Sequence, residues 1–208
     1  MKKMICLLLA LTLCVGLCCG LSGCGSSGYG VKTIVTLVEQ DYSLAFRTDD
    51  LQYYYVVAAL EQLNYNGRVK ELTMKWFGED ITTFGKSADA LERIGMPEPK
   101  TFIIGVDINS FPLAYISNGL YWGFDIELAS SVCELLGWEL AIHTIEKEDV
   151  AVELASGNID CAWGGIALNE NELAKEKYVA YGPYVHNDVL RHHPHSRRHP
   201  EKSIPVEN

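Results

Sequence analysis

The stretch TFIIGVD, from Thr101 to Asp107, opens the part of the sequence that decides the fold. It is a short apolar run, rich in β-branched residues, that ends at a carboxylate, and this pattern predicts a buried strand. The stretch DIELASSVCELLG, from Asp125 to Gly137, then places apolar residues at helical spacing. An aspartate at the start and a glycine just past the end are typical helix caps, so we expect a capped amphipathic helix here.

The sequence beyond this helix continues the alternation of elements. Residues 138–144 alternate like a strand, residues 148–156 have helical spacing before a glycine, and residues 159–163 again have the pattern of a strand. The order strand, helix, strand, helix, strand predicts a mostly parallel sheet flanked by helices. The expected fold class is therefore α/β.

The residues before Thr101 predict further elements of the same kind. Strands are expected at residues 31–39 and 42–46, and helices at residues 49–63 and 69–76. Leu72 and Trp76 lie on one face of the second helix, and we expect that face to pack against the sheet formed by residues 100–163.

Several blocks of the sequence resemble, in order and spacing, the bacterial extracellular solute-binding proteins of family 3, the polar amino acid type. These blocks are IGVD (104–107), SFPLAY (110–115), NG (118–119), GFDIELA (123–129), SGNID (156–160) and GPY (182–184). The resemblance implies a periplasmic-binding-protein-like lobe of type II. It also implies a solute receptor for an ABC importer, with a small polar solute of the amino acid type as ligand and an ABC permease as partner. It implies no cofactor, no metal and no catalysis.

A second resemblance to the same family lies out of order. The blocks DYSLAFR (41–47), ALEQL (59–63) and KWFGED (75–80) resemble the closing segment of these proteins, which normally follows the second lobe. Here the closing segment precedes the first one. A circular permutation would explain this order, since chain ends and crossovers lie at the surface, and so would the remnant of a tandem array. Either explanation gives one rearranged lobe.

These patterns divide the chain into six parts. They are a lipoprotein signal peptide (1–23), a flexible leash (24–30), the closing segment of lobe 1 (31–80), a linker (81–99), the first segment of lobe 1 (100–189) and a tail expected to be disordered (190–208). The tail contains three prolines and several histidines without apolar periodicity. No counterpart of a second lobe is found, so we expect a one-lobed or truncated form.

The first residues have the arrangement of a bacterial lipoprotein signal. Lys2 and Lys3 precede an uncharged apolar run, and small residues then lead to Cys24 and a Gly/Ser-rich leash. In this interpretation Cys24 is lipidated and anchors the protein at the extracytoplasmic face of the cell membrane. An uncleaved membrane helix is the alternative, although the apolar run is short for a helix that spans a bilayer.

Charge and cysteine content limit the other functions. The chain has 17 Lys and Arg against 27 Asp and Glu, a net charge of −10, which argues against nucleic acid as a partner. Cys133 and Cys161 are the cysteines of the predicted lobe, and both occupy apolar positions. Buried free thiols are favoured over a disulfide, because sequence alone does not place them close together.

The resemblance also predicts which residues face the ligand. They are Asp107, Phe111, Tyr115, Trp163, Gly164 and Gly165, at the ends of strands where ligands bind in α/β folds. In the resembling family an arginine holds the α-carboxylate of the amino acid, and the corresponding position here is Glu172. No arginine occurs between Arg93 and Arg191. Because the usual carboxylate clamp is missing, we expect weak capture of a solute or none, and the alternative is a non-binding lobe that docks on a permease or a sensor protein.

Overall fold

The structure is a computed structural model, and it describes residues 41–168, 178–186 and 204–205. The chain divides into two units, Met1–Leu37 and Val38–Asn208, and the first lies wholly outside the described residues. The predicted signal peptide, Cys24, the strand at 31–39, Glu172 and the histidines of the tail also lie outside them. The fold described below belongs to the second unit.

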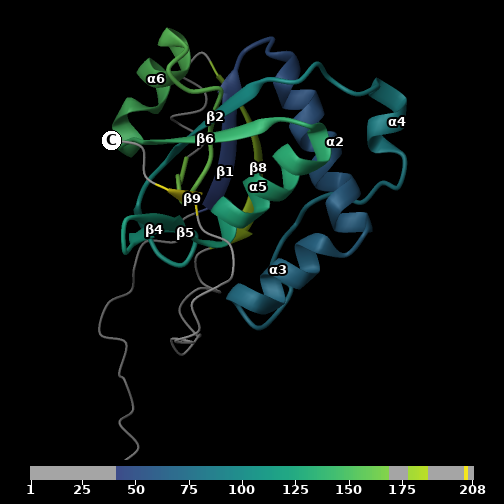
Figure 1. Ribbon diagram of the computed structural model, residues 1–208, viewed down its shortest axis with the longest axis horizontal. Coiled ribbons are helices and arrows are strands. Elements are labelled where there is room, and N and C mark those ends of the chain that lie inside the picture. Colours follow the sequence, from purple (N-terminus) through teal and green to yellow (C-terminus); the bar gives the residue numbers. More distant parts are fainter. Residues whose placement is uncertain (1–40, 169–177, 187–203, 206–208) are drawn as a thin grey trace, which may run out of the picture. The chain divides into compact units, whose positions relative to one another are not determined.

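A five-stranded sheet forms the centre of this unit, with the strand order β6-β2-β7-β1-β8 (Figure 1). The strands are β1 (Asp41–Arg47), β2 (Thr101–Val106), β6 (Glu139–Thr144), β7 (Cys161–Ala162) and β8 (Tyr178–His186). β2 pairs in parallel with β6 and β7, whereas β1 pairs antiparallel with both β7 and β8. Four strands therefore run in one direction and β1 alone runs against them, so the expected α/β lobe with a mostly parallel sheet is confirmed.

Helices cover both faces of the sheet. They are α2 (Leu51–Tyr65), α3 (Arg68–Trp76), α4 (Ala90–Ile94), α5 (Phe124–Leu136), the 3₁₀ helix η1 (Lys147–Asp149) and α6 (Val150–Ser156). The alternation of side chains along β1 explains the two layers. Leu44 and Phe46 are buried in the core that also contains residues of α2, α3 and α5, whereas Ala45 is buried in a smaller core with Val150 and Leu154 of α6.

A second, smaller sheet follows β2. Its strands are β3 (Asn109–Ser110), β4 (Ala114–Ser117), β5 (Leu120–Trp122) and β9 (Ile204–Pro205), in that order. Asn118 and Gly119 connect β4 to β5, and both have positive φ angles, 54° and 72°. Asn-Gly is the most favourable pair for such a two-residue hairpin turn. This hairpin is not among the predicted elements. Ile204 and Pro205, in the tail that the sequence predicts to be disordered, pair with β5.

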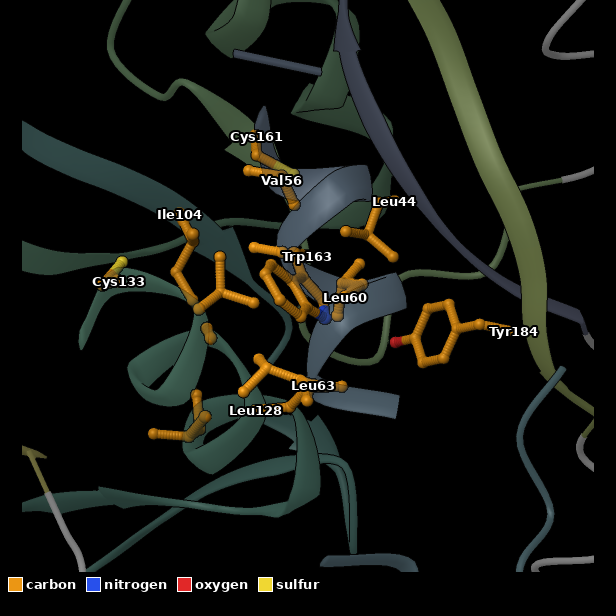
Figure 2. Close-up of a cluster of buried hydrophobic side chains, with 14 of the residues drawn as sticks. Leu44, Val56, Leu60, Leu63, Ile104, Leu128, Cys133, Cys161, Trp163 and Tyr184 are labelled. Carbon is orange, nitrogen blue, oxygen red and sulfur yellow. The ribbon is translucent and has the colours of Figure 1, made fainter. Parts of the chain in front are cut away.

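The early segment of the chain shares one core with the later one. β1 lies between β7 and β8, and α2 and α3 both pack against α5. Leu44 and Leu60 from the early segment lie beside Ile104, Leu128 and Trp163 from the later one (Figure 2). On α3, Leu72 is fully buried as predicted, whereas Trp76 is only partly buried at the edge of the core.

The stretch predicted to be a linker, residues 81–99, also packs onto the lobe. The ring of Phe84 stacks on Tyr181 and Tyr184, with ring centroids 6.2 and 5.3 Å away. The side-chain amide of Asn64 donates to the carbonyl oxygens of Phe84 and Gly85. This stretch therefore packs into the core of the lobe, and it contains the short helix α4.

The two cysteines of the lobe are buried free thiols, as predicted. Burial raises the pKa of the Cys133 thiol to about 12 and raises that of Cys161 well above its ordinary value. Both therefore remain protonated at neutral pH and act as small apolar side chains.

Candidate functional site

The candidate site lies where β2 and β7 end side by side. Asp107 follows β2, and Trp163, Gly164 and Gly165 follow β7. The backbone N–H of Asp107 donates to the carbonyl oxygen of Gly164 at 2.9 Å, which joins the two strand ends. Ligands of α/β proteins bind at this edge, beyond the carboxyl ends of parallel strands.

The loop formed by Gly164 and Gly165 requires glycine at both positions. Their φ angles are +133° and +72°, a region of backbone conformation that side chains disfavour. A Cβ atom on Gly164 would also collide with Val106, and one on Gly165 would collide with Ser110. The hydroxyl of Ser110 instead donates to the carbonyl oxygen of Gly165 at 2.9 Å. The loop is thus packed tightly against the end of β2 and the start of the small sheet.

Asp125 holds the same loop from the other side. Its Oδ2 accepts a hydrogen bond from the backbone N–H of Gly165 at 2.9 Å and another from the Tyr184 hydroxyl at 2.7 Å. The sequence predicts Asp125 as the cap of α5, and this prediction is wrong. The N-cap is Gly123, and Asp125 is the second residue of the helix, with its side chain fully buried.

The surroundings of the Asp125 carboxyl have opposing effects on its pKa. Burial raises the pKa to about 7, while the hydrogen bonds from Tyr184 and Gly165 oppose this rise. The indole N–H of Trp163 also favours the charged form, although it makes no hydrogen bond of standard geometry with the carboxyl. Asp125 therefore changes its charge near neutral pH.

The structure separates the predicted site residues into two groups. Asp107, Gly164 and Gly165 lie together, and Oδ1 of Asp107 accepts a hydrogen bond from the backbone of Asn109 at 2.9 Å. Trp163 precedes this loop, but its side chain is fully buried in the core (Figure 2). Its backbone is buried as well, and its N–H donates to the carbonyl oxygen of Gly105 at 2.8 Å.

The second group is aromatic. Phe111 follows β3 and is 53% exposed, and its ring meets that of Tyr115 on β4 edge to face, with centroids 5.1 Å apart. Tyr115 in turn meets Trp76 of α3 edge to face at 6.3 Å. These three rings form an aromatic row that runs from the segment after β2 to α3.

The site also contains three residues that are not among the predicted site residues. They are Ser110, Asp125 and Tyr184, which fix the Gly164–Gly165 loop and its surroundings. All three stand within the quoted blocks SFPLAY, GFDIELA and GPY. The three positions are far apart in the sequence, so the signal that points to them as site residues is their place in these blocks.

No arginine of the described ranges is left over to hold a carboxylate at this site. Arg47 pairs with Asp50 and Asp160, and the remaining two pairs are Arg68 with Glu71 and Arg93 with Asp89. The described part of the site therefore offers no arginine to hold the α-carboxylate of an amino acid. Glu172, the position that corresponds to this arginine, lies outside the described residues.

A pocket of about 330 Å³ lies beside β8 and contains none of the predicted site residues. It is lined by Tyr53, Thr83, Phe84 and residues 180–184. Tyr184 connects the pocket to the candidate site, because its ring stacks on Phe84 while its hydroxyl donates to Asp125.

Comparison with known proteins supports the resemblance seen in the sequence. Residues 102–192 match the family of bacterial extracellular solute-binding proteins, family 3. The resemblance to this family is thereby confirmed for residues 102–192, which contain the Gly164–Gly165 loop and most of the sheet. The matched family consists of solute-binding proteins, in agreement with the expectation that the protein is not an enzyme.

Individual relatives cover only parts of the chain. It is 29% identical over 83 residues to the probable amino-acid-binding protein YxeM of Bacillus subtilis (strain 168), which covers 40% of this chain and 31% of that protein. The chain thus spans about a third of the length of this relative. A polar amino acid ABC uptake transporter substrate-binding protein from Streptococcus thermophilus is 32% identical, with a TM-score of 0.34, over 36% of this chain and 28% of that chain.

A further solved structure is similar over a longer stretch. It is a phosphate-binding protein of a phosphate ABC transporter from Streptococcus pneumoniae TIGR4, which is 7% identical, with a TM-score of 0.41, over 71% of this chain and 50% of that chain.

Within the described residues, no helix is long and apolar enough to cross a membrane.

Proposed function

We propose that this chain provides one lobe of an extracytoplasmic solute-binding protein that serves an ABC importer of the amino acid type. The observation that carries the proposal is the Gly164–Gly165 loop, which Ser110 and Asp125 hold at the carboxyl ends of β2 and β7. These contacts fix the loop before a solute arrives, so a solute that binds beside it does not bear the cost of ordering the loop. The loop also lies within the stretch that matches the solute-binding family.

The predicted site residues have distinct roles in this proposal. Asp107 provides a carboxylate for a cationic or hydrogen-bonding group of the solute, and Gly164 and Gly165 provide backbone contacts. Phe111, which is 53% exposed, and Tyr115 provide an aromatic wall for the apolar part of the solute. Trp163 is fully buried and supports the loop from the core.

The same site leads us to expect weak binding. An amino acid carboxylate is held best by a bidentate arginine, and the described part of the site offers none. A single lobe also leaves one side of the solute in water, whereas two-lobed receptors bury it by hinge closure. We expect a dissociation constant on the order of millimolar for the lobe alone, about −4 kcal/mol.

The membrane partner and the anchor belong to the same proposal. A lipid on Cys24 would hold the lobe at the outer face of the cell membrane, beside an ABC permease. The support is the arrangement of Lys2, the apolar run, Cys24 and the Gly/Ser-rich leash in the sequence.

A non-binding lobe that docks on a permease or a sensor protein is the second candidate. The absence of an unpaired arginine from the described part of the site favours it, since capture of an amino acid would then be too weak to matter. Recovery of a permease from detergent-solubilised membranes by the tagged full chain, together with no solute binding, would support this candidate.

Isothermal calorimetry on the purified full chain tests the first candidate. A panel of amino acids and other small polar solutes should give weak heats of binding for at least one member. Phe111→Ala should abolish this heat, because it removes the exposed ring beside the site. Val152→Ala on α6 is the matched control, since Val152 is also exposed, at 65%, and lies outside the candidate site.

Two outcomes would contradict the proposal. No heat for any solute would remove the receptor function and leave the docking candidate. A micromolar affinity would show that the lobe needs neither an arginine nor a second lobe to capture its solute, and the expectation of weak binding would be wrong.

A further inference from the structure

The carboxyl of Asp125 is the most completely buried charged group of the site, and it connects three elements. Asp125 lies in the first turn of α5, and its side chain has no solvent exposure. Its Oδ2 binds Gly165, 40 residues further along the chain, and Tyr184 on β8, 59 residues further along. A buried carboxylate is costly unless hydrogen bonds compensate for its loss of water.

We propose that Asp125 is a positioning residue whose ionised carboxylate holds the Gly164–Gly165 loop in its binding conformation, so that protonation of Asp125 loosens this loop. The proposal rests on the solute-binding role proposed for the loop. It adds a switch to that role, because the state of one buried proton would decide whether the site is preformed.

The hydrogen-bonding groups around Asp125 favour the charged form by their geometry. The groups that the described residues direct at Oδ2 are the N–H of Gly165 and the hydroxyl of Tyr184, and both donate. Oδ1 of Asp125 has no hydrogen-bond partner among the described residues, so a proton can bind there while Oδ2 keeps both donors. Oδ2 then accepts as the carbonyl oxygen of a neutral carboxyl, and hydrogen bonds to a neutral acceptor are weaker than those to a charged one. Protonation therefore weakens both bonds.

The loop depends on these bonds because its two glycines have no side chains that would restrict the backbone. Gly164 and Gly165 can adopt many backbone conformations, and their conformation is fixed by contacts from outside. The contacts are Asp107 N–H to the Gly164 oxygen, Ser110 hydroxyl to the Gly165 oxygen, and Gly165 N–H to Asp125. The last of these is the one that a change of charge on Asp125 would weaken.

Three titratable groups on the strands packed against α5 remain neutral around neutral pH. Burial raises the pKa of Tyr184 on β8 and Cys161 on β7 well above their ordinary values, and burial with nearby negative charge raises that of Tyr42 on β1. The carboxylate of Asp107 also acts electrostatically on Tyr42. Burial raises the pKa of Asp125 itself to about 7, so its charge changes while these three neighbours keep theirs.

Nuclear magnetic resonance on the ¹⁵N-labelled full chain tests the proposal without any solute. The amide signal of Gly165 should shift sigmoidally between about pH 5 and 9, with a midpoint near the pKa of a buried carboxyl. Asp125→Asn should make the Gly165 signal independent of pH. Tyr184→Phe should keep the sigmoid and move its midpoint upward, because it removes a donor that stabilises the charged form.

The amide of Gly157, which caps the C-terminus of α6, provides the internal control and should not follow the same profile. A Gly165 signal that stays constant in the wild type, or that titrates equally in Asp125→Asn, would overturn the proposal. If Asp125→Asn does not fold, the wild-type profile and Tyr184→Phe still decide the question. Failure here would leave the calorimetric test of solute binding unaffected, so the two proposals fail separately.

Discussion

The ammonium group of Lys75 lies 2.9 Å from Oε2 of Glu127, whose side chain is only 2% exposed. Both carboxylate oxygens of Glu127 accept from this lysine, at 3.1 and 2.9 Å. The contact joins α3 to α5 across 52 positions of the sequence. A buried carboxylate needs a partner that compensates for its lost hydration. The Lys75–Glu127 contact therefore joins the early segment of the chain to the later segment, which resembles the first part of the family.

Replacing Lys75 by Met should destabilise the lobe by about 1–3 kcal/mol, because Glu127 would lose its charged partner while remaining buried. The loss is smaller than for a fully buried pair, since Lys75 itself is partly exposed to solvent. Urea unfolding of the purified chain measures the change. Lys70→Met on the same helix is the control, because Lys70 is exposed, and it should change stability by less than about 0.5 kcal/mol. Equal losses in both variants would show that the Lys75–Glu127 pair contributes nothing specific.

Phe84→Ala should cost about 3–5 kcal/mol, because the ring is nearly buried and stacks on Tyr181 and Tyr184. This prediction separates a packed segment from a passive linker. Thermal unfolding followed by circular dichroism gives the loss of stability. The control is Met96→Ala, in the same stretch, where the side chain is 60% exposed. If Phe84→Ala were as harmless as the control, residues 81–99 would behave as the linker that the sequence predicts.

Local patterns were enough to predict most elements of the lobe. The apolar run that became β2, the helical spacing of α5 and the Asn-Gly break after α2 each depend on residues close together in the sequence. The predicted strand at residues 159–163 is shorter in the structure, because the regular pairing of β7 extends only over Cys161 and Ala162. The packing of Phe84 was missed because it involves partners about 100 positions away.

The candidate site was harder to predict than the fold. Asp125 was interpreted as a helix cap because aspartate is common at that position in exposed helices. In the structure its side chain points into the core and binds residues 40 and 59 positions away. The burial of Trp163 was missed for a similar reason, since a strand-end position does not indicate on which side the ring packs. Long-range contacts of this kind leave no periodic signal in one sequence.

Cys24→Ser should abolish incorporation of radiolabelled palmitate into the protein and release the protein from membranes. The reason is that lipidation of the predicted signal requires the thiol of this cysteine, and serine does not replace it. The circular dichroism spectrum should stay unchanged, because the leash separates Cys24 from the lobe in the sequence. Cys18→Ser, within the predicted signal, is the matched control and should be labelled normally. Labelling of the Cys24→Ser protein would refute the anchor.

The free energy of unfolding should depend on pH through Asp125. In the folded lobe burial raises the pKa of this carboxyl from 3.8 to about 7, so between these values the folded state binds a proton that the unfolded state releases. Stability from this group is therefore present at low pH, falls as the pH rises from about 4 to about 7, and is constant above that range. A shift of about three pKa units corresponds to roughly 4 kcal/mol.

Urea unfolding at several pH values measures this dependence, and Asp125→Asn should lack it. The pKa of Asp160 is lowered, chiefly by hydrogen bonds to its carboxylate that outweigh its partial burial, so its contribution has the opposite sign and is lost at lower pH. The difference between the wild type and Asp125→Asn isolates the contribution of Asp125. Ionisation of Asp125 lowers the free energy of unfolding of the lobe, so this carboxylate has a role other than stability. Holding the Gly164–Gly165 loop is such a role. Parallel pH profiles for the two proteins would instead show that Asp125 does not titrate in this range.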